Sequence, residues 1–249
     1  MKKCYFVHIP KTAGTSIRAA LPSNLAIELY KDEDNIEKYS LGAQKHIVEN
    51  TKHFTPNMSF FHELVDKDEY DKSFKFSFVR NPYDKMVSSY IHQKENMLSY
   101  YMACTMHDKE FIYVKKYLKE FEDVREFNDL ERLYTFPYFV DYVKRVLDDG
   151  NYDFDDCHYM PQILFTHKPV TDNRYVLRLW VKNLDFIGRF ENLEEDYKEV
   201  CSILHIEPQK LPHLKRGDRV YYKKYYDDET RDIVTKLYKQ DLIKFGYSF

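Results

Sequence analysis

The residues best suited to chemistry lie near the start of the chain, in the run His8-Ile9-Pro10-Lys11-Thr12-Ala13-Gly14-Thr15-Ser16. An apolar, β-prone stretch at 4–7 precedes this run, and residues 15–21 are typical of the first turns of a helix. A loop between a strand and a helix N-terminus gathers backbone N–H groups and the positive end of the helix dipole, which favours a phosphate-like anion. Lys11 adds a cation, and the Thr and Ser side chains add hydroxyl donors. We therefore predict an anion-binding loop.

The same loop has a simpler interpretation as a tight turn in which Thr15 or Ser16 only caps the helix. Gly14 is expected where the backbone must bend or approach a ligand closely. The loop is not a Walker A loop, because that pattern places its Lys directly after the last glycine, whereas Lys11 precedes Gly14. The sequence thus disfavours an ordinary nucleoside-triphosphate kinase.

A second strand–turn–helix unit is predicted at 74–90. Its phenylalanines alternate with polar residues up to Val79, and Pro82 suits a helix start. Arg80 stands at the C-terminal end of this strand. Because ligands of open parallel sheets bind outside the carboxyl ends of the strands, we expect both units to face one ligand, with Arg80 and Ser88 reaching one phosphate from different sides. The alternative is a surface arginine and a helical serine that bind nothing.

These units predict an α/β fold in one domain, 1–249, with a P-loop-like central parallel sheet flanked by helices and with helical insertions. The insertion at about 95–135 is expected to shape a substrate groove, because variable segments on a fixed scaffold carry specificity. The other predicted elements are a strand at 186–190, a helix at 191–204 that starts with a capping box of Asn192 and Glu195, and helices at 136–147 and 233–242.

The composition of the chain argues against several classes of binding partner. The chain has 249 residues, with 41 acidic and 38 basic side chains and a formal net charge of -3, so nothing in bulk attracts nucleic acid or an anionic membrane. We see no leader peptide, no transmembrane run and no metal-binding spacing, and we expect a soluble, cytoplasmic protein without a metal. The 4 cysteines are widely spaced and are expected to be reduced thiols. The sequence does not indicate the oligomeric state.

Two of these segments, residues 7–16 and 78–84, together resemble the paired signatures of sulfotransferases that use 3′-phosphoadenosine 5′-phosphosulfate (PAPS), in the form typical of the carbohydrate sulfotransferase branch. Three shorter segments follow in the order of that family: His158-Tyr159-Met160-Pro161-Gln162, Ile187-Gly188-Arg189-Phe190-Glu191 and Phe245-Gly246-Tyr247. The resemblance covers nearly the whole chain in scattered blocks.

The resemblance implies an enzyme that moves a sulfuryl group from PAPS to a hydroxyl of a carbohydrate-type acceptor, without a metal. The loop from Lys11 to Ser16, with Thr12, Ala13, Gly14 and Thr15, would hold the 5′-phosphosulfate, and Arg80 and Ser88 would hold the 3′-phosphate. A basic loop with Arg216 and Gly217 is similar to one that closes over the nucleotide in related enzymes. Lys11 is the predicted catalytic cation, neutralising charge on the leaving 5′-phosphate.

An alcohol acceptor must lose a proton, and histidine is the natural base near neutral pH. His46 is the first candidate: a short helix is predicted around it, and Lys45-His46 resembles a stretch found there in bacterial members. The alternative for His46 is a solvent-facing side chain. His158 is the second candidate, although a contact with substrate or nucleotide would explain it equally well.

Two other functions remain open from the sequence. One is an ATP-dependent phosphotransferase of the P-loop type, and the other is a non-catalytic protein that binds a nucleotide or a glycan. The identity of the acceptor and of the hydroxyl that receives the sulfate stays open too.

Overall fold

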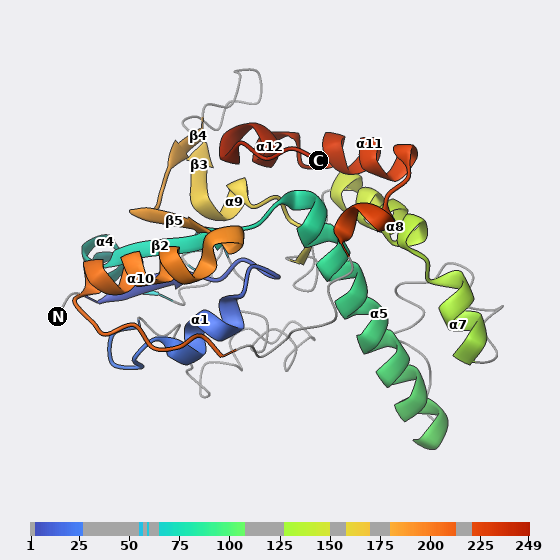
Figure 1. Ribbon diagram of the computed structural model, residues 1–249, viewed down its shortest axis with the longest axis horizontal. Coiled ribbons are helices and arrows are strands. Elements are labelled where there is room, and N and C mark those ends of the chain that lie inside the picture. The colour runs from blue at the N-terminus through green and yellow to red at the C-terminus, as the bar shows by residue number, and fades with distance from the viewer. Residues whose placement is uncertain are drawn as a thin grey trace.

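The computed structural model describes residues 3–26, 55–56, 59, 65–107, 127–149, 158–169, 180–212 and 221–249. At its centre lies a parallel sheet in the order β1-β2-β5, formed by β1 (Cys4–Val7), β2 (Phe74–Val79) and β5 (Phe186–Arg189) (Figure 1). In the register, Val7 pairs with Ser77, and Val79 pairs with Arg189. The three strands therefore end at one edge of the sheet, and the predicted α/β fold with a parallel sheet is confirmed.

Helices cover both faces of this sheet, as Figure 1 shows. One face packs against α1 (Gly14–Ala20) and α10 (Leu193–Leu204) through a core that includes Phe76 and Phe78. The opposite face carries α4 (Lys67–Lys72), α9 (Ile163–Thr166) and α12 (Lys239–Phe245). A small antiparallel pair, β3 (His167–Pro169) with β4 (Trp180–Lys182), follows α9. The sheet edge that should carry the site is thus held from both sides.

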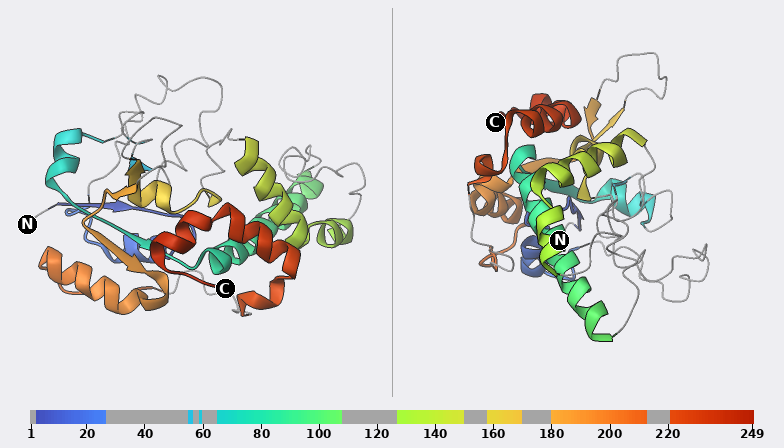
Figure 2. Two further views of the ribbon diagram at one scale, coloured as in Figure 1. Left: turned by 90° about the horizontal axis from the view of Figure 1, so that it is seen from above. Right: turned by 90° about the vertical axis from the view of Figure 1, so that its right-hand side faces the viewer.

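A helical group stands beside the sheet, beyond the end of β2 (Figure 2). Its core is rich in tyrosine and phenylalanine rings, such as Tyr90, Tyr134 and Phe139, in mutual contact. These rings account for part of the 23 tyrosines and 18 phenylalanines of the chain. The group consists of α5 (Pro82–His107), α7 (Phe127–Leu133), α8 (Phe136–Asp149), the 3₁₀ turn η6 (Tyr222–Tyr225) and α11 (Asp228–Leu237).

The helix predicted to start at Pro82 is confirmed as α5, which continues to His107. Two other predicted details of the helices were wrong. The helix expected at 233–242 is split between α11 and α12 at Tyr238, whose φ of -107° and ψ of 24° leave the helical region. The capping box at Asn192 is absent. A 3₁₀ turn, η5 (Phe190–Asn192), leads directly into α10, and the Asn192 amide donates instead to Asp196 at 2.7 Å.

Two of the cysteines, Cys4 and Cys201, are buried free thiols, as the sequence predicts. Burial raises the pKa of the Cys4 thiol to about 11, which keeps it protonated and inert. Across the described ranges, no three His, Cys, Asp or Glu side chains are grouped to hold a metal. No helix in those ranges is both long and apolar enough to span a bilayer.

Candidate functional site

The loop after β1 has an unusual backbone. Lys11 and Ala13 both lie in the left-handed region, with φ of 67° and 68°, although neither is a glycine. Left-handed residues spaced in this way turn successive peptide N–H groups toward one side, a concave arrangement that binds anions. Helix α1 begins at Gly14, and its N-cap is Ala13, so no side chain caps it. The simpler interpretation, with Thr15 or Ser16 as the cap, is therefore wrong.

The hydroxyls of the loop do not all serve the same purpose. Thr12 is fully buried and donates its hydroxyl to the Ile9 carbonyl at 2.9 Å. This hydroxyl shapes the loop, and its proton is already used there rather than offered to a ligand. Thr15 is exposed and Ser16 is half-buried, and neither hydroxyl bonds to any other residue that the structure describes. These two hydroxyls are therefore available to a ligand.

Gly14 lies against a neighbouring ring that leaves no room for a side chain, and its own backbone conformation does not need a glycine. The His8 ring is buried and stacks on Phe6, with the ring centroids 5.6 Å apart. A Cβ added at Gly14 would stand 1.9 Å from His8 Cδ2, while the φ of Gly14 is not positive. The glycine thus makes room for the histidine that precedes the loop.

Replacing Gly14 with alanine should lower the free energy of unfolding by about 1–3 kcal/mol, because the added methyl overpacks the His8 ring. Urea denaturation measures this change. In the double variant Gly14→Ala/His8→Ala the ring is absent and the added methyl fits. The loss in the free energy of unfolding of the double variant should therefore be clearly smaller than the sum of the losses of the two single variants. Simple additivity would show that the His8 contact is not the cause.

Arg80, the first residue after β2, joins the second unit to the loop. Its guanidinium is buried, donates from Nη1 to the Lys11 carbonyl at 2.9 Å and donates from Nε to the Asp84 carboxylate at 2.8 Å. The same guanidinium lies 4.2 Å from the centre of the Phe190 ring in η5. The two strand ends therefore meet, and Lys11 and Arg80 are neighbours as predicted. Phe190 is a contact that sequence reasoning missed, although its block was noted.

Two further predicted residues, Ser88 and His158, lie on or against the first turns of α5. Ser88 is half-buried and lies one turn beyond Asp84 on the helix. Another turn along, the His92 ring lies 5.9 Å from the His158 ring. The Lys85 ammonium donates to the His158 carbonyl at 2.8 Å, which holds this segment against α5. Three other candidates, His46, Arg216 and Gly217, lie outside the described residues.

Sequence reasoning missed two buried polar residues behind Arg80. The Gln162 side chain forms two hydrogen bonds of 2.8 Å with the Arg80 backbone, one to its N–H and one to its carbonyl. Asp241 of α12 is fully buried, and its carboxylate accepts from the N–H groups of Gln162 at 2.7 Å and Ile163 at 2.9 Å. Gln162 stands in a block that the resemblance marked. No sequence signal singles out Asp241, because an acid in an amphipathic helix ordinarily faces water.

Burial raises the pKa of Asp241 to about 6 from 3.8, against the opposing effects of the backbone N–H groups of Gln162 and Ile163 and of the Lys85 charge. Between these two values the folded chain holds a proton that the unfolded chain has lost. The stability contributed by this group therefore falls as the pH rises through that window. The difference between the two pKa values corresponds to about 3 kcal/mol in the free energy of unfolding.

The Asp241→Asn variant should lack this pH dependence. The free energy of unfolding of the variant minus that of the wild type should therefore increase by about 2–3 kcal/mol between pH 4 and pH 7. Any constant cost of the amide is the same at both pH values and does not change this increase. Urea titrations at several pH values measure the difference. Asp232→Asn, at an exposed position on α11, is the control and should show a flat difference. A flat difference for Asp241→Asn as well would contradict the raised pKa.

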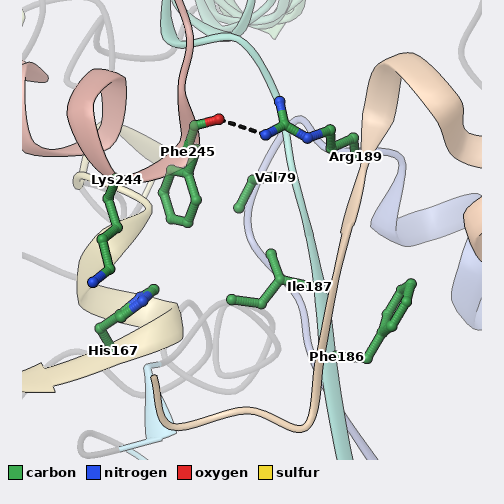
Figure 3. A pocket seen from close by; sticks show the side chains of 7 residues that line it. All are labelled: Val79, His167, Phe186, Ile187, Arg189, Lys244 and Phe245. Carbon is green, nitrogen blue, oxygen red and sulfur yellow. Dashed lines mark hydrogen bonds between the residues drawn. The ribbon is translucent and has the colours of Figure 1, made fainter. Parts of the chain in front are cut away.

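A cavity of about 300 Å³ lies at the edge of the sheet, between β5 and α12 (Figure 3). Its walls combine apolar residues with basic ones, and Arg189 is fixed there by a hydrogen bond from its guanidinium to the Phe245 carbonyl. None of the predicted site residues is among its described lining residues, which are Val79, His167, Phe186, Ile187, Arg189, Lys244 and Phe245. The cavity is thus separate from the Lys11–Arg80 contact.

Comparison with known proteins shows the family of the chain. Residues 2–248 match the model of the sulfotransferase family, and this range contains both strand-end loops. No curated protein and no solved structure matches the chain. Because the matched range is nearly the whole of a chain whose strand ends bring Lys11 and Arg80 together, this protein belongs to the sulfotransferase family.

Proposed function

We propose that this sulfotransferase uses PAPS as its sulfuryl donor and a hydroxyl of a carbohydrate-type molecule as its acceptor, by in-line displacement. The family supports sulfuryl transfer, while the donor and the acceptor are our proposal. The observation that carries it is the hydrogen bond from Arg80 Nη1 to the Lys11 carbonyl at 2.9 Å. It brings two residues with cationic side chains together at adjacent strand ends, which suits a donor that carries one charged group on the 3′ and another on the 5′ position of its ribose.

The loop after β1 is the proposed site of the 5′-phosphosulfate. Its concave backbone and the uncapped start of α1 favour the non-transferring oxygens, and the Thr15 and Ser16 hydroxyls add donors. Thr12, Ala13 and Gly14 contribute through the backbone. The Lys11 ammonium neutralises the charge that grows on the leaving phosphate, since positioning and charge stabilisation do most of the work in transfers of this kind.

Arg80 and Ser88 are the proposed ligands of the 3′-phosphate. An arginine carries more N–H donors than the two contacts of Arg80 use, so its fork can still bind a phosphate while it holds the loop. The Phe190 ring supports the plane of the guanidinium. The basic loop with Arg216 and Gly217 is proposed to close over the nucleotide, and segment 95–135 to form a wall of the acceptor groove.

Thermal unfolding tests the donor. The product nucleotide, 3′-phosphoadenosine 5′-phosphate (PAP), should raise the melting temperature without a metal, whereas ATP with Mg²⁺ should not. Stabilisation by ATP with Mg²⁺ alone would favour the phosphotransferase, and no shift with either nucleotide would contradict the proposal. Mass spectrometry of a sugar library incubated with PAPS then separates an enzyme from a binding protein, because only an enzyme adds a sulfate mass to an acceptor.

His46 is the proposed general base, with His158 as the second candidate. His46→Ala should lower turnover by about 10²–10⁴-fold while the PAP dissociation constant stays close to wild type, because the base acts on the acceptor and not on the nucleotide. The partly exposed His158, beside His92, provides the comparison. Wild-type turnover in His46→Ala, together with a large loss in His158→Ala, would move the assignment to His158.

A further inference from the structure

We propose that Gln162 and Asp241 are positioning residues for Arg80, and that they set the orientation in which its guanidinium meets the Lys11 loop. The inference rests on the proposed role of Arg80 in donor binding. Three hydrogen bonds connect these residues: the Asp241 carboxylate on α12 accepts from the Gln162 N–H, Gln162 Oε1 accepts from the Arg80 N–H, and the Arg80 guanidinium donates to the Lys11 carbonyl. The C-terminal helix is thereby linked to the anion-binding loop after the first strand.

The contact between Gln162 and Arg80 occurs where the sheet ends. The last pair between β2 and β5 joins Val79 to Arg189, so Arg80 is the first residue past the ladder. Its N–H donates to Gln162 Oε1 and its carbonyl accepts from Gln162 Nε2, both at 2.8 Å. A buried peptide group needs such partners. The Gln162 amide therefore takes the place of a neighbouring strand for one more residue of the chain. It fixes the backbone of Arg80 and, with it, the direction in which the Arg80 side chain points.

Asp241 acts on Arg80 indirectly, through Gln162. Its two carboxylate oxygens accept from two successive N–H groups at the start of α9, those of Gln162 and Ile163. These groups have no intrahelical acceptor, so the carboxylate holds the first turn of the short α9 in place. Because Gln162 belongs to this turn, Asp241 determines where the Gln162 side chain begins.

Gln162→Met tests the inference, because methionine fills a similar volume without either hydrogen bond. Its control is Thr166→Val, which removes the buried contacts of the Thr166 hydroxyl with the Gln162 carbonyl at 3.1 Å and with His167 Nδ1 at 2.8 Å but does not touch Arg80. Isothermal titration with PAP should show affinity at least about tenfold weaker in Gln162→Met and unchanged in Thr166→Val. If Gln162→Met does not fold, Gln162→Leu, which also lacks both hydrogen bonds to Arg80 and places no second carboxylate beside Asp241, carries the same comparison.

A second readout does not depend on the nucleotide. The Arg80 Nε–H group is buried against Asp84 and should give a slowly exchanging ¹⁵N signal, assigned by its absence in Arg80→Lys. Gln162→Met should shift or lose this signal, and Thr166→Val should keep it. Wild-type PAP affinity in folded Gln162→Met would overturn the inference. If wild-type protein itself does not bind PAP, the proposed donor fails, and the Arg80 signal alone then decides whether Gln162 positions the arginine.

Discussion

Replacing Lys11 with alanine should lower the turnover of sulfuryl transfer by about 10²–10³-fold, the loss typical of removing one preorganised charge-stabilising group. The ammonium would meet the charge that develops on the leaving 5′-phosphate, and this charge is greatest in the transition state. Turnover should therefore fall much more than the affinity for PAP. Single-turnover kinetics with PAPS, alongside titration with PAP, separate the two effects.

The fold should tolerate this change. Lys11 is half-buried, and its φ of 67° disfavours lysine and alanine alike, so the substitution does not alter the backbone strain. Lys11→Arg keeps the charge and should retain more activity than the alanine variant. Lys144→Ala, at a solvent-exposed ion pair on α8, controls for a general loss of positive charge. Wild-type turnover in Lys11→Ala would remove Lys11 from the mechanism.

Local patterns in the sequence predicted the elements that carry the site. The alternation of Phe74, Phe76 and Phe78 places a strand, because every second side chain of β2 enters the core under α10. Strand-to-helix loops with a cation then follow β1 and β2. The rule that ligands bind at the carboxyl ends of parallel strands brings Lys11 and Arg80 together without knowledge of any side-chain position.

Contacts between residues distant in the chain could not be predicted in this way. Gly14 suggested a bend or a close approach to a ligand, and no local pattern shows that the His8 ring, which packs against Phe6, fills the space beside it. Asp241 follows the pattern of a surface acid but reaches the buried start of α9. The capping box at Asn192 failed because η5 enters α10 without the extended residue that such a cap needs. Each case depends on geometry that no local pattern contains.

Arg80→Ala should reduce both the stability of the protein and its affinity for PAP. The variant leaves the Lys11 carbonyl and the Asp84 carboxylate without their charged partner in a largely buried place, which should cost about 3 kcal/mol in the free energy of unfolding. PAP affinity should fall by about a hundredfold or more, since a phosphate would lose a charge-assisted contact. Urea denaturation and isothermal titration measure the two effects separately.

The double variant Arg80→Ala/Asp84→Asn distinguishes these two effects. Replacing the unpaired Asp84 carboxylate with an amide should recover part of the free energy of unfolding that Arg80→Ala loses. PAP affinity should stay low, because the guanidinium is still absent. Arg189→Ala is the control for charge: Arg189 is exposed, pairs with Val79 at the neighbouring strand end, donates to the Phe245 carbonyl and lies 4.8 Å from the Tyr247 ring centre. The variant loses a cation, a bond to a carbonyl and a ring contact without touching the Lys11 loop, and its PAP affinity should remain near wild type. Equal losses in Arg80→Ala and Arg189→Ala would mean that positive charge at this edge of the sheet, and not the contact between Arg80 and Lys11, attracts the nucleotide.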